Sequence, residues 1–253
     1  MDLQRKIDSE LTKQKAPYAD DTDATSSDKV ALIAQGYAEI ENLLVVLSDL
    51  RRRESHIFHS RFSDSLELKH LCQKENISSI WEQNILETIF PTDLESKFLN
   101  ELLFLQFLKT QPKSKRFDYY LSQKLRMRDK TGAYIDALHR QYYLPNDRRD
   151  STRYELCLYG PLNVVTDYRA WLTDMTNGHQ INIDLSSGKK ILSRQETEVL
   201  KLIELGRKSK EIAELLNISV HTVSRHRQNI IDKLQVRNSV EACRIARRLG
   251  IFQ

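Results

Sequence analysis

Apolar residues recur at helical spacing in four short segments near the end of the chain. The first begins with S-R-Q-E, a capping box in which Ser193 and Glu196 each accept a hydrogen bond from the other's backbone N–H. Gly206 is expected to end this helix, because glycine readily adopts the left-handed conformation of a helix stop. Further helices are expected from Ser209 and over residues 239–249. The pattern therefore predicts a small all-helical domain.

The third segment, residues 219–234, separates polar and apolar positions most clearly. At about 100° per residue, three apolar side chains fall on one line: Val223, Ile230 and Leu234. The opposite side carries His221, Ser224, Arg225, Gln228 and Asp232. Arginine and glutamine pair bidentately with guanine and adenine in the major groove of DNA, which favours a DNA-reading face. A solvated face on an ordinary surface helix is the alternative.

The connection before this helix favours the DNA-reading interpretation. Asn217, Ile218 and Ser219 leave room only for a sharp corner between two helices, as in a helix-turn-helix. Ser219 is a good N-cap for the third helix. The other three helices are expected to bury Val199, Leu200, Leu202, Ile203 and Leu205, then Ile212, Ala213, Leu215 and Leu216, and finally Val240, Ile245, Ala246 and Leu249. The last set either completes the core or pairs two copies.

Residues 192–252 resemble the LuxR-type helix-turn-helix, which is also found in many response regulators. The resemblance rests on L-S-R-Q-E-T-E-V-L-K-L-I at 192–203, K-E-I-A at 210–213, I-S-V-H-T-V-S-R-H-R-Q-N-I-I-D-K-L at 218–234 and E-A at 241–242. It covers about a quarter of the chain. It implies that the base-facing residues are Ser224, Arg225 and Gln228, and that Lys210, Thr222 and Lys233 hold phosphates.

Two further residues of the third helix lie at the edges of its packed stripe. Arg227 is expected to extend along the surface to the DNA backbone, as a further phosphate contact. His226 is expected to be half-buried and hydrogen-bonded within the domain rather than to contact DNA. Charge agrees with a nucleic-acid partner, because residues 186–253 hold 14 Lys and Arg against 7 Asp and Glu, and the rest of the chain holds 25 against 28.

The pattern changes in the first 185 residues. Residues 1–26 are expected to form a short helix and a loose arm, followed by a helix near 27–39. A hairpin is expected from strands at 42–50 and 55–60, then helices over 64–72, 78–90 and 93–109. Strands are expected at 117–127, 133–144 and 153–159, because apolar residues alternate there and D-K-T-G at 129–132 forms a turn.

The expected order of elements resembles that of a PAS sensor domain: a strand pair comes first, then several helices, then three long antiparallel strands. L-R-M-R-D-K-T-G-A-Y at 125–134 resembles the central hairpin of such domains, and the resemblance covers residues 37–184. PAS-like domains bind a small molecule between sheet and helices, or only dimerise. An aromatic set is expected either to line a pocket or to be core: Trp81, Phe104, Phe107, Phe117, Tyr119, Tyr134 and Tyr142.

No cofactor or metal is predicted. Cys72, Cys157 and Cys243 lie far apart and form no CxxC pair. His56 and His59 are three residues apart on an expected strand, so their side chains point to opposite faces. The chain is 40% hydrophobic and 29% charged, as soluble globular proteins are. Because no apolar run approaches the roughly 18 residues of a membrane span and the first 25 residues are too polar for a signal peptide, a cytoplasmic protein is expected.

Three other functions are alternatives for this sequence. A phosphorelay receiver needs an acidic pair at the end of a first strand, and Asp20 and Asp21 follow no expected strand. An enzyme could use Asp136, His139 and Cys157, but no nucleophile motif or metal spacing accompanies them, so we expect no catalytic residues. The runner-up is a protein-interaction adaptor whose helix-turn-helix no longer binds DNA. A basic third helix argues against it.

The sequence thus predicts an α+β protein of two domains from a bacterium. An N-terminal arm and helix at 1–36 precede a PAS-like sensor or dimerisation domain at 37–185, an antiparallel sheet with helices. A linker at 186–190 joins it to an all-α, four-helix LuxR-type helix-turn-helix domain at 191–253. The expected function is sequence-specific transcription regulation. The expected partners are double-stranded DNA, a second copy of the chain on DNA and a small-molecule effector, without a membrane.

Overall fold

The structure is a computed structural model that describes residues 4, 7, 11, 24–68, 74–145, 152–165, 167–183, 192–234, 236 and 238–248. The chain divides into two compact units, residues 1–182 and 183–253. The first contains an antiparallel sheet with helices and the second is helical, so the predicted fold class is confirmed. The predicted linker at 186–190 and most of the N-terminal arm lie outside the described residues, and the predicted domain boundaries stay predictions.

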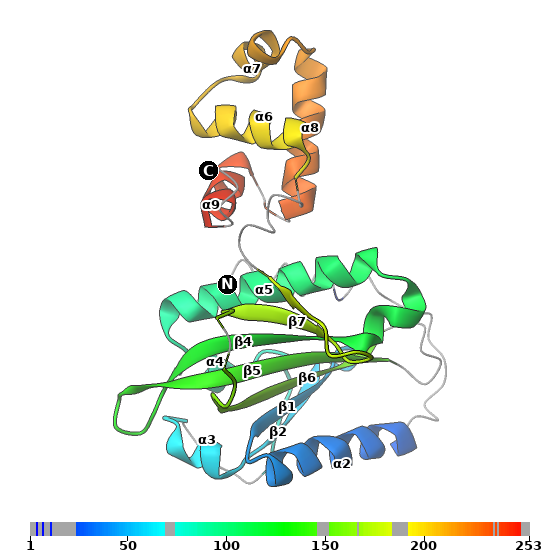
Figure 1. The fold of residues 1–253 in the computed structure, drawn as a ribbon, viewed down its shortest axis with the longest axis vertical. Helices are drawn as coiled ribbons and strands as arrows, with labels where there is room; N and C mark the ends of the chain where they lie inside the picture. Colours follow the sequence, from blue (N-terminus) through cyan, green and yellow to red (C-terminus); the bar gives the residue numbers. More distant parts are fainter. Residues whose placement is uncertain are drawn as a thin grey trace. The chain divides into compact units, whose positions relative to one another are not determined.

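One antiparallel sheet runs through the first unit in the order β3-β2-β1-β6-β5-β4-β7-β8 (Figure 1). Its strands are β1 (Leu44–Asp49), β2 (Glu54–Phe58), β3 (Lys74–Ile77), β4 (Tyr119–Arg128), β5 (Tyr134–Pro145), β6 (Thr152–Pro161), β7 (Ala170–Asp174) and β8 (Gln180–Asn182). The hairpin β1–β2 and the three long strands β4, β5 and β6 confirm the predicted elements. The short strands β3, β7 and β8 were not predicted.

Helices lie on both faces of this sheet (Figure 1). Helix α2 (Ala24–Ile40) packs Ala34 and Ala38 against a core cluster that includes Val45 and Leu156. Helix α5 (Pro91–Thr110) lies on the other face, where its Asn100 bonds to Gln123 of β4. The remaining helical segments of this unit are α3 (Arg61–Ser65), α4 (Gln83–Leu86) and η1 (Lys113–Asp118). Because side chains alternate along a strand, each face of the sheet has its own core.

The helices predicted at 64–72 and 78–90 were largely wrong. Helix α3 ends at Ser65, residue Leu66 is extended, and α4 covers only four residues. Strand β7 pairs only with residues 119–123 of β4, which leaves the rest of that edge open. Leu66 and Ile89 form isolated bridges to Asp129 and Met127 beyond it. Hydrogen bonding to the open sheet edge therefore determines the structure at Leu66 and Ile89, although the apolar residues around them have helical spacing.

The second unit contains the four predicted helices: α6 (Arg194–Glu204), α7 (Ser209–Leu216), α8 (Val220–Leu234) and α9 (Ser239–Arg248). Gly206 takes a φ of 77°, as the predicted helix stop requires. Three of the predicted core positions were wrong, since Leu205, Leu215 and Val240 are 72%, 62% and 80% exposed. At about 100° per residue these side chains lie at least 100° from the centre of the buried stripe of their helix.

Within the part of the chain that the structure describes, no helix combines the length and the apolar character needed to cross a lipid bilayer.

Candidate nucleic-acid interface

A sharp corner joins α7 to α8. Asn217 takes a left-handed conformation, with φ 52° and ψ 47°, and the Ile218 N–H donates to the Ala213 carbonyl at 3.0 Å. The Ser219 Oγ accepts the Thr222 N–H at 3.0 Å, so Ser219 is the N-cap of α8 as predicted. Asparagine tolerates this conformation better than other side chains, which fixes the direction in which α8 leaves the corner.

Helix α8 packs with one side and exposes the other. Val223, Ile230 and Leu234 are 0%, 1% and 3% exposed. The predicted base-reading residues Ser224, Arg225 and Gln228 are all exposed on the other side. Ser224 Oγ donates to the Val220 carbonyl at 3.1 Å, and Gln228 Nε2 donates to Asp232 Oδ1 at 2.9 Å. These two bonds lie within one helix at the surface, where a partner can replace them.

The four residues predicted to contact phosphates differ in their surroundings. Lys210 is exposed in the first turn of α7. Thr222 is half-buried, and its Oγ1 lies 2.8 Å from Ser219 Oγ. Arg227 Nη1 donates to Ser209 Oγ at 3.0 Å, which links α8 to the start of α7. Arg227 is thus tied to the start of α7, where Lys210 lies, whereas Thr222 lies in the first turn of α8 after the corner.

Lys233 lies at the far end of α8 and forms a contact within the unit. Its Nζ lies 2.7 Å from Glu196 Oε2, while the same oxygen accepts the Ser193 N–H at 2.7 Å. The predicted capping box is thus confirmed and extended by a lysine. Burial raises the pKa of the Glu196 carboxyl, but the hydrogen bonds from Lys233 and Ser193 outweigh it and hold that pKa below its ordinary value. Lys233 stabilises the junction of α6 and α8.

The sequence did not reveal Ser209 and Glu196 as partners of α8. They lie 18 and 37 positions from the residues that they bond. Helical periodicity reports which side of one helix is buried, but it contains no information on which distant residue faces it. His226 is half-buried as predicted, yet among the described residues its Nδ1 has no hydrogen-bond partner.

Helix α9 completes the core of the unit. Ala242, Ile245 and Ala246 are 0%, 3% and 0% exposed. Arg247 forms an ion pair with Glu204 of α6, which ties α9 to the domain. Of the predicted apolar set, Ile245 and Ala246 are therefore core, Val240 is exposed and Leu249 lies outside the described residues. Pairing of two copies through α9 stays a prediction.

The aromatic set of the first unit does not gather at one site. Phe104 is fully buried on the α5 side and stacks on Tyr143. Tyr142 stacks on Tyr120, next to the core cluster under α2 on the opposite face. Other members form separate pairs, namely Trp81 with Phe98, Phe107 with Tyr119 and Tyr134 with Phe90. These contacts indicate that the aromatic residues pack against one another in separate pairs.

The three residues of the alternative catalytic set do not lie together. His139 and Cys157 are buried on the α5 side, whereas Asp136 is exposed. Asp136 and His139 are an odd number of residues apart on β5, so their side chains point to opposite faces.

Comparison with known proteins concerns mainly the second unit. The family "Bacterial regulatory proteins, luxR family" matches residues 190–246. The response regulatory protein YgeK of Escherichia coli is 43% identical over 60 residues, which are 24% of this chain and 41% of that protein. The oxygen regulatory protein NreC of Staphylococcus aureus is 40% identical over 79 residues, 31% of this chain and 36% of that protein. This chain thus spans about two fifths or less of these relatives.

A solved structure aligns along most of the chain at low similarity. The Vibrio cholerae VqmA dimer, described as a LuxR-type receptor, gives a TM-score of 0.33 and 13% identity over 89% of this chain and 88% of that chain. These values are too low to show a common fold. The match that carries weight is the one at the C-terminus, where the capped α6, the α7–α8 corner and the two-sided α8 coincide with the family's segment. The C-terminal unit of this chain is a LuxR-type helix-turn-helix domain.

Proposed function

We propose that this protein is a sequence-specific DNA-binding transcription regulator that reads the major groove with α8. In this proposal Ser224, Arg225 and Gln228 contact base edges, and phosphates are held by Lys210, Thr222, Arg227 and Lys233. The observation that carries it is the exposed polar face of α8, set by the corner at Asn217 against a buried apolar face. A helix presented in this way is the recognition helix of a helix-turn-helix.

Charge supports the choice of a polyanionic partner. The excess of basic residues lies in the last 68 residues, while the remaining chain is slightly acidic. Neutralising phosphates with lysine and arginine releases counterions, so affinity should fall steeply as salt rises.

The first unit is proposed to be a PAS-like sensor or dimerisation domain. Two copies of the chain on DNA would place two α8 helices on two half-sites, and a ligand of the first unit would change the spacing that the pair can occupy. The proposal includes control by a small molecule, without a catalytic step.

Selection of bound duplexes from a random pool by the full-length protein tests this function. We expect an inverted repeat, with a Kd for the repeat that is at least a thousandfold lower than for unrelated DNA at the same salt concentration. The control is Arg61→Ala, which removes one positive charge from α3 in the other unit and should keep the same repeat.

The adaptor stays the second candidate. Its support is the set of bonds that Gln228 and Lys233 form with Asp232 and Glu196, since these occupy polar groups of α8 without DNA. If the full-length protein selects no motif, with or without a metabolite extract, the regulator is ruled out in favour of the adaptor.

A further inference from the structure

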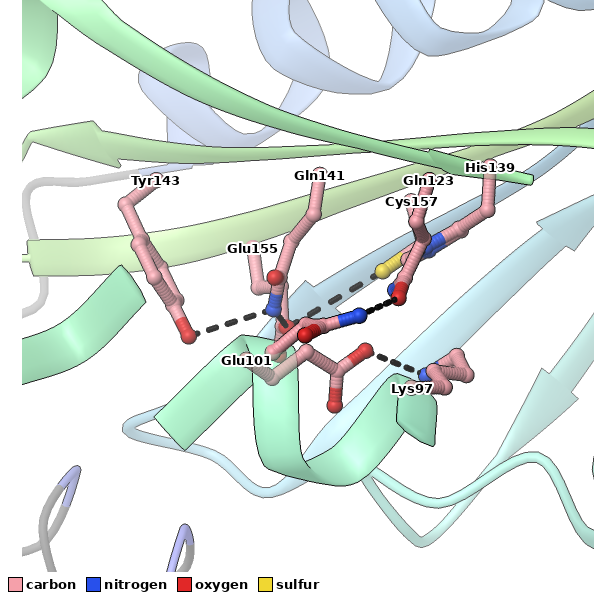
Figure 2. A network of polar contacts seen from close by, with 9 residues as sticks. Lys97, Glu101, Gln123, His139, Gln141, Tyr143, Glu155 and Cys157 are labelled. Atoms are coloured by element: carbon pink, nitrogen blue, oxygen red, sulfur yellow. Dashed lines mark hydrogen bonds and ion pairs between the residues drawn. The ribbon is translucent and has the colours of Figure 1, made fainter. Parts of the chain in front are cut away.

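The sheet face under α5 carries a buried polar cluster where an apolar core is expected. Gln123 of β4 pairs in register with His139, Cys157 pairs with Gln141, and Glu155 pairs with Tyr143. These six side chains share one face, because residues paired across strands point to the same side. Figure 2 shows them opposite Lys97 and Glu101 of α5. We call these eight residues the inner cluster.

Carboxyl groups outnumber ammonium groups in and beside the inner cluster. Lys97 Nζ lies 2.5 Å from Glu101 Oε1, and these side chains are 4% and 2% exposed. Burial lowers the pKa of Lys97, but the Glu101 carboxylate outweighs it and keeps this lysine charged. The neighbouring Glu82 is also buried and Glu155 is half-buried, and neither forms an ion pair with another described residue. One ammonium group therefore lies among three carboxyl groups, and only Glu101 is paired with it.

His139 has a ring N–H donor without a partner among the described residues. The Asn100 amide donates to Gln123 Oε1 at 3.0 Å, so the Gln123 Nε2 is the group that faces His139 Nδ1, at 2.9 Å. An amide nitrogen only donates, so Nδ1 accepts and the proton of the neutral ring lies on Nε2. Burial and the charge of Lys97 hold the pKa of His139 far below its ordinary value, which keeps the ring neutral. His139 Nε2 is buried without a partner among the described residues.

Unused acceptors lie two residues further along β5. Gln141 Nε2 donates to Glu155 Oε1 and to Tyr143 Oη, which leaves the buried Gln141 Oε1 without a donor in the described structure. The hydrogen bonds of Glu155 come from Gln141 and, weakly, from the Cys157 thiol at 3.9 Å. A buried polar atom without a partner is unfavourable, so a ligand that supplies the missing acceptor and donor would satisfy His139 Nε2 and Gln141 Oε1.

We propose that the inner cluster binds a small amine, whose ammonium group donates to Glu155 and Gln141 Oε1 and whose hydrogen-bond acceptor receives the His139 Nε2–H. This inference rests on the proposed sensor function of the first unit and names its ligand class. His139 and Gln141 are about 7 Å apart along β5, so the amine and the acceptor of the ligand are separated by a short chain or one ring. No group of three metal-ligating side chains lies in the described residues, so a metal ion is a poorer fit.

Proton release accompanies binding in this arrangement. Burial and the nearby Glu101 raise the pKa of Glu155 to about 8, so the carboxyl group holds a proton at neutral pH when no ligand is bound. An ammonium ligand replaces this proton. The other titratable groups that face the site are Glu82 before α4, Lys97 and Glu101 of α5, His139 and Tyr143 of β5, and Cys157 and Tyr159 of β6. Apparent affinity for an amine should therefore rise up to about tenfold per pH unit below the pKa of Glu155.

The test uses the full-length protein and matched probes at millimolar concentration: 3-aminopropanamide, 4-aminobutanamide and 5-aminopentanamide, each against its hydroxyl counterpart. We expect at least one amine to raise the Tm of the first unit by about 3 °C or more, and by more at pH 7.5 than at pH 6.5. The hydroxyl counterpart should give a smaller shift without this pH dependence.

Glu155→Gln should abolish the amine-induced shift, while Glu41→Gln, the same change at an exposed ion pair with Arg140, should keep it. If no amine exceeds its hydroxyl counterpart, or if Glu155→Gln responds like the unmodified protein, the ligand class is wrong. His139→Phe is the second variant, and retention of the full shift there also overturns the site.

DNA binding separates this inference from the proposed function. A protein that selects a motif but shows no amine shift disproves only the ligand class. An amine shift in a protein that selects no motif supports the site and disproves the regulator. Arg225→Ala should keep the shift, because the substitution lies in the other unit.

Discussion

At the scale of single residues, Arg225 is the side chain on which sequence discrimination should depend most. It is exposed on the face of α8 opposite Val223, and its guanidinium can pair bidentately with guanine. Arg225→Ala should therefore raise the Kd for the selected repeat by about 10- to 100-fold, while the Kd for unrelated DNA changes less. Fluorescence anisotropy with both duplexes measures this, with Arg61→Ala as the charge-matched control. Equal losses on both duplexes would place Arg225 on phosphate instead.

Substitutions at Lys210 and Lys233 should distinguish a lysine that only binds phosphate from one that also stabilises the fold. Lys210 is exposed, so Lys210→Ala should weaken binding to all duplexes alike and reduce the salt dependence by about one phosphate contact. Lys233→Ala should also weaken all duplexes, but in addition it removes the cation that pairs with the nearly buried Glu196 carboxylate. Urea unfolding should then show a loss of about 1–3 kcal/mol for Lys233→Ala and almost none for Lys210→Ala. Equal stability of the two variants would show that the pair with Glu196 contributes nothing.

Periodicity predicted the exposed residues of α8 because helix geometry alone decides which positions share a side. The bonds of those residues could not be predicted, since Glu196 and Ser209 come near α8 only after the chain folds. The polar inner cluster was missed for a related reason. Gln123 interrupts an apolar alternation and appeared as an exception, whereas its partner Asn100 lies 23 positions away.

At the scale of elements, the corner between α7 and α8 depends on the left-handed conformation of Asn217. A β-branched side chain is strained there, so Asn217→Val should lower the free energy of unfolding by about 1–3 kcal/mol and weaken DNA binding by misdirecting α8. Asn217→Gly should be tolerated within a few tenths of a kcal/mol, because glycine adopts this conformation without strain. Denaturant melts and anisotropy of both variants test this. Similar values for valine and glycine would show that the corner tolerates a different backbone.

Elements that pack against neighbours in sequence were predicted better than those that complete a sheet. The hairpin β1–β2 and the strands β4 to β6 have alternating apolar positions and clear turns, so local pattern and final structure agree. The segments around Leu66 and Ile89 have helical spacing but are extended, since they bond to the uncovered end of β4. A local pattern contains no signal of an open sheet edge that lies 38 or more residues further along the chain.

At the scale of the whole molecule, the two units should respond differently to pH. In the first unit, burial raises the pKa values of Glu155 and Glu82 to about 8 and about 7. The folded state then binds more protons than the unfolded state, so stability is lost as pH rises through these values. His139 has the opposite effect, because its pKa is lowered in the folded state. The unfolded chain binds a proton there first, so stability is lost as pH falls below about 6.5, the ordinary pKa of a histidine. In the second unit the pKa of Glu196 is lowered, so this group costs stability only when the pH falls below the ordinary pKa of a glutamate.

Between pH 6.5 and pH 8 these shifts should therefore destabilise the first unit and leave the second unchanged. The expected loss is about 2 kcal/mol, mostly from Glu155, since a shift of one pKa unit corresponds to about 1.4 kcal/mol. For a unit of this size the loss should lower the Tm by roughly 4–8 °C. Scanning calorimetry should show one transition that moves with pH and one that does not, and Glu155→Gln should remove most of the movement. A wild-type first unit that is equally stable at both pH values would mean that Glu155 is already ionised at pH 6.5 and that the inner cluster holds its charge without a ligand.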